Sequence, residues 1–136
     1  MSMTRSRALA ALAAIAPLAL SACAVIPDAP LVSGTPWPQG SAVALMQPVK
    51  VGDLVVTPRE VVEDSRCPIN ARCVWAGRLI VRTRIDGAGW RDTADITLGE
   101  TFGTHGQVIA LVSGVPGTVA GQETPPEAYR FSYELR

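Results

Sequence analysis

The chain has 136 residues, and its 12 lysines and arginines balance 12 aspartates and glutamates, so the formal net charge is zero. This length fits one domain. The balanced charge argues against a nucleic-acid-binding protein, which normally carries a basic patch and a high pI. The hydrophobic fraction of 48% argues against disorder along the whole chain.

The first 22 residues have the organisation of an export signal. Arg5 and Arg7 stand in an N-terminal stretch without acids, and residues 8–20 form an uncharged run of Ala, Leu and Ile with one Pro. A short positive segment followed by a short apolar segment is typical of a secretory signal peptide. The apolar run is shorter than the roughly 20 residues that a membrane-spanning helix needs. We therefore expect residues 1–22 to be a cleaved signal peptide.

The residues Leu20-Ser21-Ala22-Cys23 resemble the lipobox of bacterial lipoproteins. The resemblance implies that Cys23 is acylated on its thiol, becomes the N-terminus after cleavage and is acylated again on its amine. Several acyl chains on one residue give durable membrane anchoring. Ala24 rather than aspartate follows the cysteine, which by the same resemblance favours the outer membrane, with the domain facing the periplasm or the surface. The alternative is an ordinary signal peptide that is cut after Ala22.

Residues 23–40 are expected to form a lipidated tether, because prolines at positions 27, 30, 36 and 38 prevent a long helix and leave little to bury. Trp37 lies inside this stretch. It is interpreted either as an interfacial anchor or partner contact, or as a side chain that folds back onto the domain. Residues 41–136 would then form the folded domain.

Beyond the tether the sequence predicts an all-β fold. Valine and glycine are absent from the signal peptide and frequent afterwards, which favours strands and turns. Clear alternation of apolar and polar residues, typical of antiparallel strands with one buried face, occurs in residues 78–85, 92–98 and 129–135. Shorter candidate strands are residues 43–46, 54–57, 60–64 and 107–112. Residues 86–89 predict a hairpin turn, and loops are expected at residues 99–106 and 114–126. Six to eight short strands predict a small antiparallel β-sandwich or barrel.

Cys67 and Cys73 remain once Cys23 is lipidated. In an oxidising compartment an even pair usually forms a disulfide, and the spacing is not that of a thioredoxin-type redox pair. A redox pair or metal thiolates are the alternatives. The surrounding residues, from Asp64 to Gly77, resemble a D-S-R-C-P-x4-C-x-W-A-G signature of small, exported, largely uncharacterised bacterial proteins. The resemblance implies an exported all-β domain and no particular activity.

The loop around these cysteines is the first candidate binding site. Asp64 is expected to cap the turn or to pair with Arg66, and Trp75 is expected to pack against the disulfide or the core. One hypothesis makes the loop a rigid, exposed recognition surface formed by Arg66, Ile69, Asn70, Arg72 and Trp75. The other makes it a stapled turn that holds two strands in register.

A stripe of arginines is the second candidate. Arg78, Arg82 and Arg84 lie two or four positions apart on one face of a predicted strand, so their guanidinium groups would cluster. Such a stripe is suited to an anionic partner such as lipopolysaccharide phosphate or an acidic glycan. In the other interpretation, Asp92 and Asp95 pair with these arginines across the hairpin.

Other motifs for chemistry are scarce. His105 is the single histidine, and no neighbouring cluster indicates a metal site. Neither a G-x-S-x-G elbow nor a phosphate-binding glycine motif occurs. We therefore expect no cofactor and no metal. The leading hypothesis is a noncatalytic lipoprotein, anchored in the membrane through Cys23, that acts as a binding or envelope-accessory module for an envelope protein or an anionic glycan.

Two alternatives to this hypothesis stay open. The first is a small envelope hydrolase, which would require His105 within hydrogen-bond reach of a serine or an aspartate. The second is a protease inhibitor that presents the loop between Cys67 and Cys73 to its target.

Overall fold

The structure is a computed structural model that describes residues 34–136. The expected signal peptide, the lipobox with Cys23 and most of the tether lie outside the described residues. The described part of the chain holds seven antiparallel strands and one short 3-10 helix, which confirms the predicted all-β fold. In chain order these elements are β1 (Val49–Val51), β2 (Leu54–Asp64), β3 (Leu79–Gly87), β4 (Trp90–Thr97), β5 (Thr101–Thr104), β6 (Gln107–Val115), η1 (Pro126–Ala128) and β7 (Arg130–Leu135).

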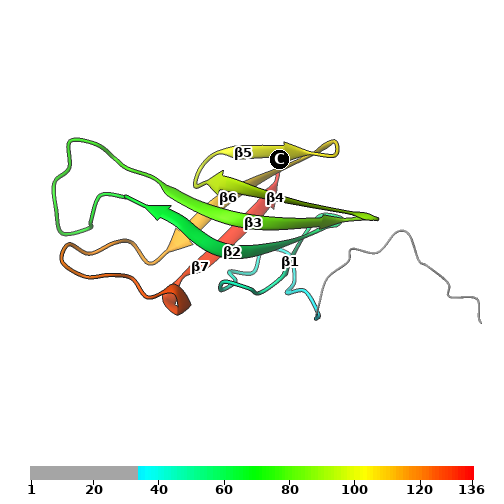
Figure 1. Cartoon of the computed structure of the whole chain (residues 1–136), viewed down its shortest axis with the longest axis horizontal. Helices are drawn as coiled ribbons and strands as arrows, with labels where there is room; N and C mark the ends of the chain where they lie inside the picture. Colours follow the sequence, from blue (N-terminus) through cyan, green and yellow to red (C-terminus); the bar gives the residue numbers. More distant parts are fainter. Residues whose placement is uncertain (1–33) are drawn as a thin grey trace, which may run out of the picture.

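The strands form two sheets with a shared core. One sheet has the order β1-β2-β3-β4 and the other the order β5-β6-β7 (Figure 1). Apolar side chains from both sheets make up one buried cluster, and the Thr83 hydroxyl lies 2.9 Å from the Tyr133 hydroxyl across the two sheets. The chain therefore folds as a small sandwich, with one face of each sheet turned inward.

The period-2 prediction is most accurate for β3. Leu79, Val81, Thr83 and Ile85 are all fully buried, as predicted. In β7 the predicted inward residues are buried up to Tyr133, but the side chain of Leu135 at the strand end is 42% exposed. The alternation thus identifies the buried face where a strand crosses the centre of the sandwich and fails where it leaves the core.

Several boundaries differ from the predictions. Residues 54–57 and 60–64 form the single strand β2, in which register shifts after Pro58 and Val61 interrupt the alternation. Residues 43–46 form no strand, because Val43 alone makes a bridge, to Phe131. The short strand β1 was not predicted.

Strand β5 lies inside the segment that was predicted to be a loop. It is rich in Thr and contains Gly103, so its composition resembles a turn, but it pairs with β6 across the two-residue turn His105-Gly106. Both turn residues have left-handed backbone conformations, with φ of 46° and 74°. Such a turn suits the twist of a hairpin, so β5 is held by pairing rather than by its own propensity.

Trp37 attaches the described end of the tether to the domain. Its backbone N–H donates to the carbonyl of Pro48 at 2.8 Å, and its carbonyl accepts from the N–H of Lys50 at 2.9 Å. The interpretation in which this residue folds back is therefore correct for the backbone, while half of the side chain stays exposed.

Candidate functional site

The connection between β2 and β3 is the most elaborate loop of the described chain, and residues 65–78 are named the disulfide loop here. It continues the hairpin beyond the sheet, because the Ser65 N–H donates to the Arg78 carbonyl at 2.9 Å and the Cys67 N–H donates to the Ala76 carbonyl at 3.1 Å. Cys67 and Cys73 form the predicted disulfide, with their Cα atoms 5.8 Å apart. The loop is thus closed covalently at its far end and by hydrogen bonds at its base.

Arg66 fastens the base of this loop to the opposite sheet. Its guanidinium donates to both carboxylate oxygens of Asp64 at 2.7 Å and to the carbonyls of Gly114 at 2.6 Å and Pro116 at 2.9 Å. The hydroxyl of Tyr129 donates to the same carboxylate at 2.8 Å. These three side chains, Asp64, Arg66 and Tyr129, form a group that we name the arginine clamp. The predicted pairing of Asp64 with Arg66 is confirmed. Arg66 stabilises the base of the loop and is not part of its exposed surface.

The clamp shifts the pKa values of its members. Burial acts to raise the pKa of Asp64, but the hydrogen bonds from Arg66 and Tyr129, together with the guanidinium charge, outweigh it and lower that pKa. The hydrogen bond to Asp64 raises the pKa of Arg66. Burial, followed by the hydrogen bond to Asp64, raises the pKa of Tyr129. The arginine clamp therefore stabilises the ionised form of the Asp64 carboxyl group.

The arginine clamp predicts that the stability of the fold depends on pH in the acid range. The pKa of Asp64 is lower in the folded protein than in the unfolded chain, where it is about 4. The stabilisation is thus complete above the unfolded pKa and is lost as the pH falls through the lower folded pKa. We expect Asp64→Asn to be less stable than the wild type at pH 7 and to lose less stability between about pH 5 and pH 2. Urea melts across this range measure both effects, and equal acid slopes for the two proteins would contradict the role of the clamp.

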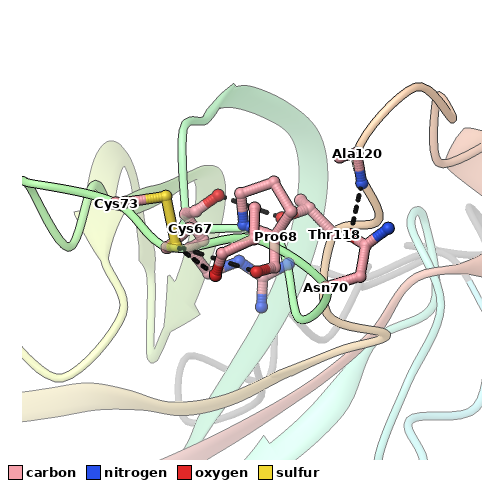
Figure 2. Close-up of a disulfide and its surroundings, with 8 residues drawn as sticks. Cys67, Pro68, Asn70, Cys73, Thr118 and Ala120 are labelled. Atoms are coloured by element: carbon pink, nitrogen blue, oxygen red, sulfur yellow. Dashed lines mark hydrogen bonds between the residues drawn. A yellow bond between two sulfur atoms is a disulfide. The ribbon is translucent and has the colours of Figure 1, made fainter.

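A second loop supports the disulfide loop from the side. Residues 116–125, named the support loop, connect β6 to η1 and lie at the same end of the molecule (Figure 1). The N–H of Ile69 donates to the carbonyl of Thr118 at 2.9 Å, and the Thr118 hydroxyl donates to the carbonyl of Arg66 at 2.9 Å. Figure 2 shows the third contact, in which the Ala120 N–H donates to the side-chain oxygen of Asn70 at 2.9 Å. Asn70, predicted as a recognition residue, thus joins the two loops.

Three apolar residues of the disulfide loop are exposed. The exposed fractions are 78% for Ile69, 90% for Val74 and 82% for Trp75, and these three residues are named the apolar tip. The prediction that Trp75 packs against the disulfide or the core is wrong, because its side chain is largely exposed on a loop that projects beyond both sheets (Figure 1). Arg72 is also exposed. Val74 was not predicted as a site residue, since nothing but its place between Cys73 and Trp75 marks it.

The arginines of the predicted stripe are paired with carboxylates. Arg78 donates to Glu63 at 3.0 Å, and Arg82 donates to both Glu60 and Asp95 at 3.0 Å. The pair with Asp95 is the cross-hairpin contact that the second interpretation predicted, whereas the two glutamates come from β2 on the other side of β3.

The third arginine of the stripe has a buried partner. Arg84 donates at 2.9 Å to Asp86, whose side chain is completely buried and also accepts from Arg91. The expected pairing of Asp92 with an arginine of the stripe is wrong, because the Asp92 carboxylate accepts from the hydroxyl of Thr104 at 2.8 Å. The arginine stripe is thus neutralised by neighbouring carboxylates.

His105 lies at the opposite end of the sandwich, at the β5–β6 turn. Its ring stacks on Trp90 with centroids 3.8 Å apart, and its Nδ1 lies 3.0 Å from the hydroxyl of Thr104. Because that hydroxyl donates to Asp92, it accepts from His105 Nδ1. These contacts join β4 to the β5–β6 turn across the two sheets. His105 therefore meets a threonine hydroxyl rather than the serine or aspartate that the hydrolase hypothesis requires.

A cleft of about 770 Å³ lies beside this histidine, and its polar lining consists of Lys50, Asp53, His105 and Gln107. The lining includes no serine or cysteine that could serve as a nucleophile. Over residues 34–136, no group of three or more His, Cys, Asp or Glu side chains is placed to bind a metal ion, and no helix is long and apolar enough to cross a membrane.

The described chain is thus a small disulfide-containing β-sandwich with a supported, apolar loop at one end. No protein-family model, curated protein or solved structure matches the chain.

Proposed function

We propose that this protein is a noncatalytic lipoprotein of the cell envelope whose β-domain binds an envelope component through the apolar tip. The observation that supports the proposal is the exposure of Ile69, Val74 and Trp75 on a loop that three sets of contacts stabilise. The disulfide closes the loop, the arginine clamp fixes its base, and the support loop bonds to its side.

Exposed apolar side chains on one short, ordered loop favour binding. Burying them against a partner removes apolar surface from water, which is the main driving force of association. A loop that is already ordered loses little conformational entropy when it binds. Tryptophan is among the residues that contribute most to binding interfaces, and Trp75 is the largest side chain of the apolar tip.

The anchoring part of the proposal rests on the lipobox. We expect Cys23 to become the acylated N-terminus, because a thiol is needed to carry the lipid and small residues precede it. The mass of the N-terminal peptide of the mature protein should equal a chain that begins at Cys23 plus its acyl groups. The variant Cys23→Ser should accumulate in the soluble fraction or with its signal peptide uncut. An unmodified N-terminal peptide that begins at residue 23 would contradict the proposed anchor.

The binding part of the proposal is tested without the lipid. The chain from residue 24 onward, produced without its signal peptide, is mixed with envelope fractions of the source bacterium and sedimented. We expect part of it to sediment, and we expect Trp75→Ser and Val74→Ser to abolish most of this association. The matched controls are Trp37→Ser and Val108→Ser, which remove exposed apolar side chains at other places on the surface. Equal sedimentation of tip and control variants would refute the role of the apolar tip.

A further inference from the structure

The chemistry of the disulfide loop points to one kind of partner, and we propose that the apolar tip inserts into the interface of an anionic phospholipid surface. This inference rests on the proposed function and names the envelope component. The first observation is that the part of the loop beyond its base, residues 67–77, contains one arginine, Arg72, and no acidic residue. An apolar and cationic loop is complementary to a surface that offers hydrocarbon below a layer of negative headgroups.

Arg72 is the cation that this loop presents to a partner. The other two arginines of the loop are engaged at its base, Arg66 with Asp64 and Arg78 with Glu63. Within residues 34–136 no carboxylate forms an ion pair with Arg72, which is exposed beside Cys73 and the apolar tip. A planar guanidinium binds phosphate oxygens in a bidentate manner, so Arg72 is suited to a phosphate headgroup.

The apolar side chains are suited to the interface itself. Tryptophan prefers the boundary between headgroups and hydrocarbon, and the smaller residues Ile69 and Val74 add apolar area on the same loop. A stable protein interface typically takes roughly 20–30 residues a side, whereas the apolar tip consists of three residues on a protruding loop. Shallow insertion into lipid needs no complementary partner surface, so a narrow tip favours lipid over protein.

The disulfide loop lies far from the start of the described chain (Figure 1), so membrane contact through the apolar tip would be separate from the lipid anchor. The disulfide loop forms one end of the long axis in Figure 1, and the cyan segment with which the described chain begins lies toward the other end. Lipid on Cys23 and the apolar tip would therefore hold the domain at two separated points.

The test uses vesicles of defined composition and the chain from residue 24 onward. Binding is measured to phosphatidylcholine vesicles with and without 30% phosphatidylglycerol, and insertion is measured by quenching of tryptophan fluorescence with brominated acyl chains. We expect binding to the anionic vesicles that weakens with salt, and quenching that disappears in Trp75→Phe. Trp75→Ser should weaken binding about tenfold, and its matched control Trp37→Ser should change it less than twofold.

The contribution of Arg72 to binding is tested separately. Arg72→Gln should weaken binding to anionic vesicles about fivefold and leave binding to phosphatidylcholine unchanged. Its control, Arg78→Gln, removes an arginine that is already paired with Glu63 and should have a smaller effect. Thermal melts establish that each variant is folded.

The outcomes separate this inference from the proposed function. Absence of vesicle binding, together with envelope sedimentation that still depends on Trp75, overturns the lipid partner and leaves a protein or glycan partner of the apolar tip. Envelope sedimentation that does not depend on Trp75 overturns both proposals. Vesicle binding without quenching from the brominated chains also overturns the inference, because the tip then does not insert.

Discussion

Replacing Arg66 with alanine is expected to lower the free energy of unfolding by about 3–5 kcal/mol. The substitution leaves the Asp64 carboxylate, whose side chain is only 8% exposed, without its cation. It also removes the donors that satisfy the carbonyls of Gly114 and Pro116. A buried charge that loses its partner costs much more than an exposed ion pair contributes. Chemical denaturation at pH 7 measures the loss.

Two further variants make this prediction specific. Arg66→Lys keeps the charge but cannot form the fork to Asp64 and reach both carbonyls, so it should recover only part of the stability. Arg78→Ala removes the exposed pair with Glu63 and should cost less than about 1 kcal/mol. If Arg66→Ala and Arg78→Ala are destabilised equally, the arginine clamp does not hold the loop as described.

Replacing Gly77 with alanine is expected to cost about 3 kcal/mol or more. Gly77 has a left-handed backbone with φ of 66°, and a Cβ atom at this position would overlap the carbonyl group of Ser65. The obstructing atoms belong to the backbone of the opposite arm of the disulfide loop, so neither arm can move without breaking the hydrogen bonds at the loop base. The free energy of unfolding, measured by denaturant titration, gives the size of the effect.

The chain provides a matched control for this substitution. Gly99 has a φ of 86°, and a Cβ atom there would have no heavy atom within 4 Å. Gly99→Ala therefore carries only the cost of the left-handed conformation, about 1–2 kcal/mol. The difference between the two variants measures the overlap at the loop base. Equal losses for Gly77→Ala and Gly99→Ala would show that the two arms of the loop are not in close contact.

The sequence predicts a strand correctly where one face of that strand is buried along its whole length, because apolar residues then recur at every second position. In β3 a single strand crosses the whole core, so the buried residues Leu79, Val81 and Ile85 fall at every second position with Thr83, and Ile80 is the one apolar residue on the other face up to Ile85. In β2 the register shifts change which face successive residues occupy, and the pattern splits into two apparent strands. β1 and β5 are too short for a period to be visible, and they exist because a neighbouring strand pairs with them.

The candidate site could be predicted only in part. The disulfide and the pairing of Asp64 with Arg66 involve residues close in the chain, where spacing and charge are informative. The bonds to Gly114, Pro116 and Thr118 join residues about 50 positions apart, and no local signal marks them. The sequence leaves open whether Trp75 packs inward or is exposed on a recognition loop, because a tryptophan next to a disulfide packs inward only if the loop lies over a core.

The most direct test of the proposed function is photo-crosslinking from the apolar tip in intact cells. A photoreactive amino acid replaces Trp75, Val74, Trp37 or Val108 in the full-length chain, one position at a time. We predict that positions 75 and 74 give strong adducts with one envelope component, which we expect to be phospholipid, and that positions 37 and 108 give none with it. Equal adducts from all four positions, or none from the apolar tip while the control positions react, would contradict a docking role for the disulfide loop.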